Sequence, residues 1–317
     1  MKEIGGYFGL EQLIKNEYYK DLIALNSARN ALVYILEARK IKKLYIPYFL
    51  CDSVAGALEK EGYKYEYYHI DKTFLPAFDK RLDKDEYLYI VNYYGQIDKE
   101  RIIELKNRYG NIILDNVQAF FQEPILGIDT IYSLRKFFGV PDGAYLYCDA
   151  SLDKEIPTDA SMNRMKHILG RYEGESASLY YSDFKANDAS FKEEPLKYMS
   201  PLTHNILGAI DYEGARKTRE ENYKHLEKEL GKINKLDFKM PKGPYAYPFY
   251  CENGMEIKKR LAEKKIFVAT LWPNVLNMNG TLEKDLAENI LPLPVDQRYN
   301  DEDMHKVVLE VLSCLKN

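Results

Sequence analysis

The sequence contains only four cysteines among its 317 residues, and they are not arranged for a disulfide framework or a zinc site. They are widely separated, and no two of them form a C-x-x-C pair: Cys51, Cys148, Cys251 and Cys314. We therefore expect reduced thiols and a cytoplasmic protein. The five histidines are likewise scattered without the spacing of metal ligands, so we predict no metal site.

Long apolar runs, a strong net charge and several well-known catalytic motifs are also missing. No apolar run approaches the roughly 20 residues of a membrane-spanning helix, and residues 1–6 lack the apolar core of a signal peptide. A net charge of -4 gives no indication of a nucleic-acid partner or of binding to an anionic membrane. The motifs G-x-S-x-G, G-x-G-x-x-G and G-x-x-x-x-G-K-[ST] do not occur, which argues against the hydrolases, dinucleotide-binding proteins and nucleoside triphosphatases that carry them.

What the first half of the sequence does contain is a regular alternation of strand-like and helix-like segments. Strand patterns occupy residues 21–25, 44–49, 63–70, 87–91, 112–115, 130–133 and 144–147, and helix patterns occupy 28–39, 53–60 and 99–108. This alternation predicts an α/β fold with a mostly parallel, doubly wound sheet.

The pattern weakens between residues 150 and 201, where polar stretches such as 182–188 favour loop or irregular helix. Beyond it we predict a long helix over 205–230, strands at 247–251, 266–269 and 289–293, and helices at 256–264 and 302–315. We therefore divide the chain into a large domain, 1–204, and a smaller C-terminal α/β domain, 205–317.

Two of the strand patterns lead into residues of complementary chemistry. The strand at 112–115 ends in Asp115, and the strand at 130–133 is followed by Lys136. Ligands of open α/β sheets bind outside the carboxyl ends of the strands, so both side chains are placed where a ligand is expected. Pyridoxal 5'-phosphate (PLP) requires a lysine that binds its aldehyde and an acid that keeps its pyridine nitrogen protonated.

A third feature completes this set, because residues 26–30 open a helix directly after a strand. A helix N-terminus with a hydroxyl group such as that of Ser27 beside it is suited to binding a phosphate. Each feature alone has a plainer explanation. Ser27 could be only a helix cap, Asp115 a turn residue and Lys136 one of many solvated lysines. The prediction of a PLP site therefore depends on the three occurring together.

These residues, and their order along the chain, resemble the DegT/StrS-type aminotransferases, a branch of the fold-type-I PLP-dependent enzymes. The family has an Asp with a polar group three residues later, then a Ser before the cofactor-binding Lys and a glycine-containing return into a strand. Here these are Asp115, Gln118, Ser133, Lys136 and residues 137–144. Four further family motifs are similar to residues 27–32, 46–49, 92–95 and 291–303, so the resemblance spans most of the chain.

The resemblance implies a fold-type-I large domain, a smaller C-terminal domain and a role for each site residue. Lys136 would be the catalytic residue, which binds the cofactor covalently and moves the proton. Asp115 would pair with the pyridine nitrogen, and Gln118 would lie near the ring hydroxyl. The phosphate would be held by Ser27, Ala28 and Ser133.

The implied activity is the transfer of an amino group, expected to come from glutamate, to a keto-sugar or a related carbonyl compound. Such a reaction belongs to surface-polysaccharide or amino-sugar biosynthesis. The resemblance also implies a homodimer with its active sites at the subunit interface, and small-molecule substrates as the other partners.

One family segment is missing from this chain. After the lysine, the family has a Gly-aromatic-Asn-aromatic-Arg segment whose Asn reaches the cofactor phosphate of the partner subunit. Around residues 197–205, Ser200, His204 or Asn205 of a second copy could take over this contact. Alternatively, Arg29 or Arg135 could neutralise the phosphate within the same chain.

Two other functions are compatible with such a fold. A non-catalytic or regulatory homologue is the main alternative, and the presence of both Asp115 and Lys136 favours the enzyme over it. A PLP-dependent sugar dehydratase is disfavoured, because those relatives have histidine in place of the lysine.

Overall fold

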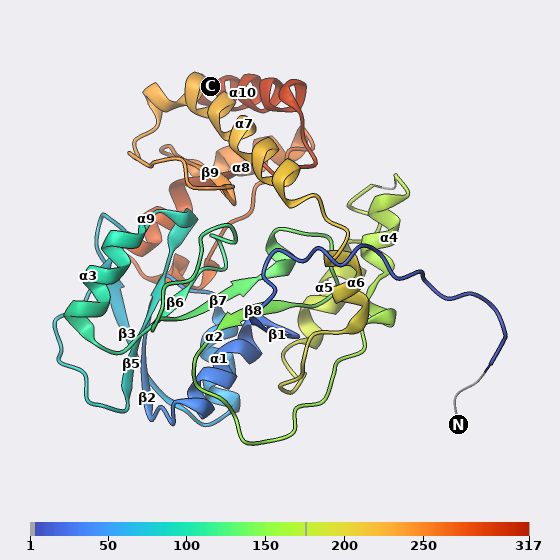
Figure 1. Ribbon diagram of the computed structural model, residues 1–317. Helices are drawn as coiled ribbons and strands as arrows, with labels where there is room; N and C mark the ends of the chain where they lie inside the picture. The colour runs from blue at the N-terminus through green and yellow to red at the C-terminus, as the bar shows by residue number, and fades with distance from the viewer. Residues whose placement is uncertain (1–3, 175, 317) are drawn as a thin grey trace.

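An eight-stranded sheet forms the centre of the larger part of the molecule in this computed structural model, which describes residues 4–174 and 176–316 (Figure 1). In spatial order its strands are β1 (Ile23–Leu25), β8 (Ala144–Tyr147), β7 (Asp129–Ser133), β6 (Ile112–Asp115), β5 (Glu86–Val91), β2 (Lys43–Pro47), β3 (Lys64–Ile70) and β4 (Pro76–Ala77). The pairs formed by β7, β6, β5, β2 and β3 are parallel, whereas β1 and β8 at one edge and β4 at the other pair antiparallel. The predicted α/β fold with a mostly parallel sheet is confirmed.

Helices connect the strands and pack on the sheet. α1 (Ala28–Ala38) lies against β7 and β8, α2 (Asp52–Lys60) contacts α1 and β3, and α3 (Lys99–Tyr109) lies against β6. The start of α1 is set by Ser27, whose side chain accepts the N–H of Asn30.

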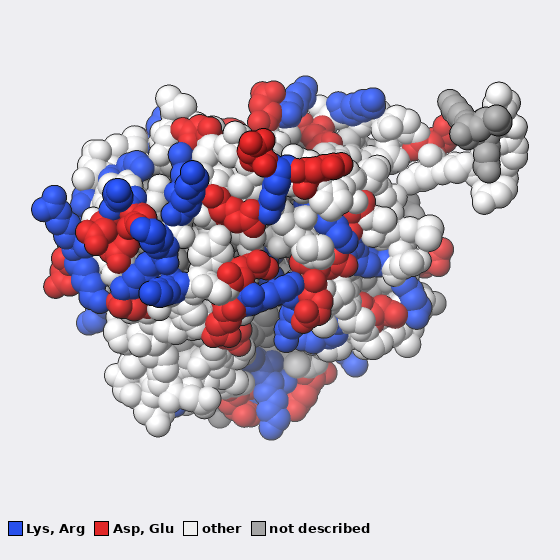
Figure 2. Space-filling view, turned by 90° about the horizontal axis from the view of Figure 1, so that it is seen from below, with Lys and Arg blue, Asp and Glu red and all other residues white. Residues whose placement is uncertain are grey.

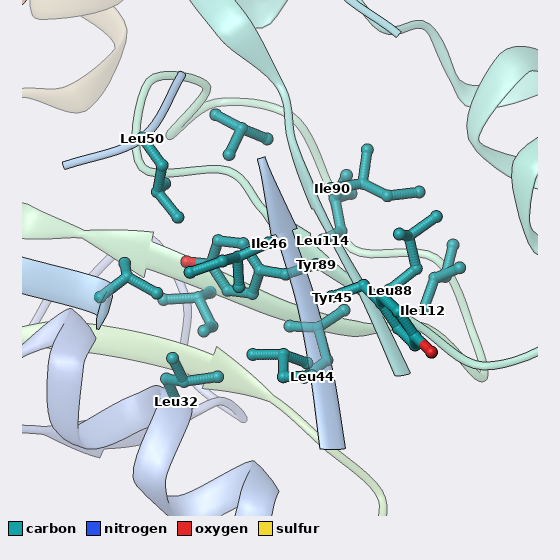
Figure 3. Close-up of a cluster of buried hydrophobic side chains, with 14 of the residues drawn as sticks. Leu32, Leu44, Tyr45, Ile46, Leu50, Leu88, Tyr89, Ile90, Ile112 and Leu114 are labelled. Atoms are coloured by element: carbon teal, nitrogen blue, oxygen red, sulfur yellow. The ribbon is translucent and has the colours of Figure 1, made fainter. Parts of the chain in front are cut away.

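The strands are apolar along most of their length because both faces of the sheet are covered. Figure 3 shows Leu44 and Ile46 of β2 in one cluster with Leu88 and Ile90 of β5 and Leu114 of β6. All five side chains are at most 1 % exposed. This packing fixes the strands relative to one another, and it therefore also fixes the residues at their carboxyl ends.

The C-terminal part of the chain forms a second, smaller unit, which lies above the sheet in Figure 1. It contains α7 (Tyr212–Leu230), β9 (Ala246–Tyr250), α8 (Gly254–Glu263), β10 (Ile290–Pro294) and α10 (Asp301–Leu315), and β9 pairs antiparallel with β10. These elements share their own apolar cluster. Between them, η5 (Pro273–Asn277) and α9 (Leu282–Asn289) pack instead on the core of the large sheet. The domain boundary between residues 204 and 205 stays a prediction.

The long helix predicted over residues 205–230 is present as α7 (Tyr212–Leu230), but its predicted start is wrong, because residues 205–207 belong to a separate helix. α6 (Pro201–Leu207) begins after its cap, Ser200, and ends at Gly208. α7 begins after Asp211, whose side chain accepts the N–H of Gly214. A new cap therefore starts a second helix only a few residues after the first one ends.

The strand predicted at residues 266–269 is also wrong. The N–H of Ile266 donates to the carbonyl of Leu261, and Lys265 has a φ of 64°, so this stretch continues from the end of α8. None of the described strands pairs with it. An apolar stretch without a neighbouring strand cannot satisfy its backbone groups in a ladder.

Regular helices occur where the sequence pattern was weak. α4 (Lys166–Tyr172) and α5 (Tyr181–Ser190) lie between β8 and α6, and α5 covers residues 182–188. The buried residue of α5 is Asn187, so this helix lacks the apolar face on which the prediction depends. Four single-turn helices complete the fold: η1 (Tyr93–Gly95), η2 (Leu134–Lys136), η3 (Met162–Arg164) and η4 (Gly231–Ile233).

The surface carries both signs of charge. Figure 2 shows basic and acidic side chains interspersed over the face seen from below, without a broad region of one sign. All four cysteines are free thiols, as predicted. Within residues 4–174 and 176–316, no helix combines the length and the apolar character that crossing a bilayer requires.

Candidate active site

A cavity of about 180 Å³ lies at the carboxyl ends of β5, β6 and β7. All six residues predicted to contact the cofactor line it: Ser27, Ala28, Asp115, Gln118, Ser133 and Lys136. They come from the start of α1, the end of β6 with the turn after it, and the end of β7 with η2. The fold therefore brings together residues that lie far apart in the sequence.

Asp115 is the last residue of β6, and its side chain is buried. Oδ2 accepts a hydrogen bond from the Tyr89 hydroxyl at 2.8 Å, and Oδ1 accepts one from the Val117 N–H at 2.9 Å. Burial raises the pKa of Asp115 above its usual range, while the charge of Lys136 and the two hydrogen bonds act to lower it. Since each carboxylate oxygen can accept two hydrogen bonds, Asp115 can still bind a cationic N–H group in the cavity.

Lys136 is the last residue of η2, directly after β7. Its side chain is exposed, and it forms no hydrogen bond or ion pair with any residue that the structure describes; Nζ lies 5.9 Å from the centre of the Tyr245 ring. The backbone next to it is held firmly. The carbonyl of Phe137 accepts hydrogen bonds from Arg219 at 3.2 Å and from Gln297 at 2.8 Å, both in the C-terminal unit. The amine is thus free to react, while the chain that carries it is fixed.

The loop after η2 is anchored from a second side. Asp142 is fully buried and accepts hydrogen bonds from the N–H of Ser200 at 2.9 Å, from its hydroxyl at 2.8 Å, and from the hydroxyl of Thr203. The next residue, Gly143, has a φ of +119°, and a Cβ there would lie 2.8 Å from a side-chain carbon of Leu134. The return of the chain into β8 therefore requires glycine at this position.

The start of α1 supplies donors on another side of the cavity. Ser27 accepts the N–H of Asn30 at 3.2 Å, so its plainer role as a helix cap is confirmed. Ala28 is the first residue of the helix, where backbone N–H groups have no partner within the helix. The hydroxyl of Ser133 adds a third polar group. Together with the helix dipole, these groups favour an anion.

Gln118 links the cavity to the turn at residues 92–95. Its side-chain oxygen accepts the N–H of Tyr94 at 2.7 Å, and the side chain is buried. Because the oxygen is held by the backbone, the amide N–H group of Gln118 is the part that can bind another group.

Several residues that line the cavity were not predicted from the sequence. Tyr89, Asp188, Phe191 and Trp272 are four of them. Tyr89 could have been predicted from the sequence, because it lies near the end of the strand pattern at residues 87–91, next to the strand that ends in Asp115. Trp272 could not, because it comes from the C-terminal part of the chain and reaches the site by packing on Phe49, with ring centres 4.2 Å apart.

The segment proposed to replace the missing Asn is occupied by contacts within its own chain. Ser200 is completely buried in the network with Asp142, so the proposal that it reaches a partner subunit is wrong. His204 forms a hydrogen bond with Glu17, and Asn205 accepts one from the N–H of Leu13. Their contacts hold the N-terminal segment against α6.

Comparisons with known proteins identify the fold of the chain. No protein-family model and no curated protein sequence matches the chain. Among solved structures, it is similar to a DegT DnrJ EryC1 StrS aminotransferase from Brucella abortus, with 16% identity over 93% of this chain and 86% of that chain and a TM-score of 0.61. The chain has the fold of these aminotransferases. The fold class predicted from the sequence is therefore confirmed.

Two further structures agree with this fold. The putative sugar aminotransferase Spr1654 from Streptococcus pneumoniae, solved in its PLP form, is 14% identical over 92% of this chain and 86% of that chain, with a TM-score of 0.63. DesI, solved in the presence of its TDP-sugar product, is 13% identical over 93% of this chain and 80% of that chain, with a TM-score of 0.64.

Proposed function

We propose that the protein is a PLP-dependent aminotransferase. The observation that carries this proposal is the pairing of Asp115 and Lys136 in one cavity of an aminotransferase fold. The carboxyl group is buried and can still accept hydrogen bonds, and the amine is free of other partners among the described residues. A non-catalytic homologue would have no use for this combination.

The residues around the cavity fit the cofactor. When bound, PLP supplies an electron sink that stabilises negative charge next to the amino group. Asp115 would hold the ring nitrogen protonated, which also supplies the positive charge that its buried carboxylate requires. Lys136 would bind the aldehyde carbon and then carry a proton on Nζ as general base and acid. Ser27, Ala28 and Ser133 would hold the phosphate, and Gln118 would bind the ring hydroxyl.

For the reaction, we propose transfer of an amino group from glutamate to a keto-sugar or a related carbonyl compound in amino-sugar or surface-polysaccharide biosynthesis. The support for this substrate class is the likeness to sugar aminotransferases, including DesI with its TDP-sugar product. The cytoplasm stays the predicted compartment, in keeping with four free thiols.

The test of the function is covalent trapping. The purified chain should bind PLP and turn yellow, and borohydride should then fix the cofactor irreversibly to Lys136, as peptide mapping would show. Lys136→Ala should give no adduct. Lys166→Ala, which removes an exposed lysine outside the cavity, should leave the adduct at Lys136 unchanged. An adduct at another lysine, or none at saturating PLP, would contradict the proposal.

We also infer a homodimer. Figures 1 and 2 show the N-terminal segment extending away from the body of the molecule, and its side chains Tyr7 and Phe8 are 98% and 94% exposed. Apolar side chains are exposed on α4 and just before α5 as well, at Leu169, Tyr172 and Leu179. A partner chain that covered these side chains would remove them from water, which favours association.

The dimer can be tested by sedimentation. We expect the chain to sediment as a dimer, and we expect the double variant Leu169→Asp/Tyr172→Asp to shift it toward monomer, because two buried carboxylates in an apolar interface are strongly unfavourable. Ile103→Asp is the matched control, since Ile103 is an exposed apolar residue on α3. A monomeric wild-type chain at micromolar concentration, with or without PLP, would contradict the inference.

A further inference from the structure

Two arginines line the same cavity as Asp115 and Lys136. Arg29 is the second residue of α1, and Arg135 directly precedes Lys136 in η2. They are distant in the sequence and meet because α1 lies against β7. Both guanidinium groups therefore belong to the region where Ser27 and Ser133 offer their hydroxyls.

Neither arginine has a strong partner among the residues that the structure describes. Arg29 forms no ion pair with them, and its Nη1 atom is buried without a hydrogen-bond partner. Arg135 contacts Asp188 at 3.3 Å and 3.4 Å. These distances are longer than the 2.7–2.9 Å of a good charge-assisted hydrogen bond. Arg135 also stacks on the ring of Phe191, 4.7 Å from its centre. A buried guanidinium without full hydrogen bonding is unfavourable unless a ligand completes it.

The charges around the cavity leave a local positive excess. Its lining contains three cations, Arg29, Arg135 and Lys136, against two carboxylates, Asp115 and Asp188. The whole chain, in contrast, carries a net charge of -4. Burial lowers the pKa of Arg135 and Asp188 raises it, while the charges of Arg29 and Arg164 lower it again, so the guanidinium groups repel one another. An anion in the cavity would relieve this repulsion.

The helix that begins at the cavity, α1, adds to the positive electrostatic potential there. The first turn of α1 contains no acidic residue, and it contains Arg29 instead. A cation at this end opposes the helix dipole, which favours negative charge there. The cost is removed if an anionic ligand lies between the helix end and the guanidinium group.

We propose that Arg29 and Arg135, with Ser27 and Ser133, form a phosphate-dianion subsite within one chain. This inference rests on the proposed function, because it assigns these two arginines to the phosphate of the cofactor. It accounts for the absence of the family's Asn segment and for the internal contacts of residues 200–205. The phosphate is anchored without any donor from a second copy, whatever the oligomeric state.

The experiment compares PLP with pyridoxal, which lacks the phosphate. Arg29→Gln and Arg135→Gln should each weaken PLP binding about tenfold to a hundredfold, since a hydrogen bond to a charged group contributes about 1.5–3 kcal/mol. Affinity for pyridoxal should change less than about threefold. Asp188→Asn should tighten PLP binding, because it removes the carboxylate that competes for Arg135. Arg101→Gln, an exposed arginine on α3 outside the cavity, is the control and should leave both affinities unchanged.

A second measurement separates this inference from the proposed function. Inorganic phosphate alone should raise the melting temperature of the wild-type chain, and the Arg29→Gln/Arg135→Gln double variant should lose that shift. If borohydride traps PLP on Lys136 but the arginine variants keep wild-type affinity for PLP, the subsite is wrong and the function stands. If PLP is never trapped but the phosphate shift depends on both arginines, the subsite stands and the function is wrong. Arg29→Lys, which keeps the charge, should fall between wild type and Arg29→Gln, and circular dichroism checks that each variant is folded.

Discussion

Replacing Lys136 with alanine should lower the rate of amino transfer by at least about a thousandfold. General acid–base catalysis by a positioned side chain alone contributes about 10²–10⁴-fold, and this variant also loses the covalent attachment of the cofactor. The fold should be unaffected, because the side chain is exposed and forms no hydrogen bond or ion pair with the described residues. The measurement is kcat for amino transfer from glutamate to a series of keto-sugars.

Two controls make this result specific. The melting temperature of Lys136→Ala without cofactor should stay within about 2 °C of wild type, as expected for an exposed position. Added methylamine should restore part of the activity, because a small amine can take over the proton transfer in the space left by the side chain. A variant that retains activity within tenfold of wild type would rule out Lys136 as the catalytic residue.

Asp115→Asn should have the second-largest effect, a loss of about tenfold to a hundredfold in kcat/KM. A neutral amide cannot balance the charge of a protonated ring nitrogen, and a hydrogen bond between charged groups is worth about 1.5–3 kcal/mol. Since the cavity is otherwise unchanged, PLP should still be trapped on Lys136. Amino transfer at the wild-type rate would show that Asp115 does not contact the ring nitrogen.

The same substitution should have the opposite effect on the cofactor-free chain. Burial raises the pKa of Asp115, so the folded chain holds this proton more tightly than the unfolded chain does. The ionised carboxylate therefore destabilises the fold increasingly as the pH rises from the unfolded pKa, about 3.9, to the higher folded value. Asn carries no charge and avoids this cost.

Thermal unfolding of both proteins against pH tests this expectation. The melting temperature of Asp115→Asn minus that of wild type should increase as the pH rises from the unfolded to the folded pKa of Asp115. At neutral pH this difference should no longer change with pH. Saturating PLP should cancel or reverse the difference, because it stabilises the ionised carboxylate of wild type. A difference that does not depend on pH would show that Asp115 has the same pKa in the folded and the unfolded chain, so that burial does not raise it.

The large sheet and three site residues, Ser27, Asp115 and Lys136, could be predicted because they depend on local pattern, whereas Ala28, Gln118 and Ser133 were expected only from the resemblance to the aminotransferase family. A strand buried on both faces is continuously apolar, so a charged residue at its end, such as Asp115, stands out. The failures have different causes. The break between α6 and α7 depends on a second cap, Asp211, inside a continuous helical pattern. The strand expected at 266–269 depends on a partner strand, which sequence alone cannot supply.

The part of the site that escaped prediction comes from tertiary packing. Trp272 and Asp188 reach the cavity from segments with no strand-end pattern, and their positions depend on how the C-terminal part and α5 pack on the sheet. The buried state of Ser200 likewise follows from its contact with Asp142, far away in the sequence. Such contacts leave no periodic signal.

The hydrogen bonds from the C-terminal unit to the carbonyl of Phe137 connect two parts of the molecule mechanically. Arg219 and Gln297 both donate to this one oxygen, and Phe137 directly follows Lys136. A hinge motion of the C-terminal unit would either break both bonds or pull on the peptide that carries the reactive amine. Any displacement of that unit by an arriving substrate would thus be transmitted over a single residue to the position of Nζ.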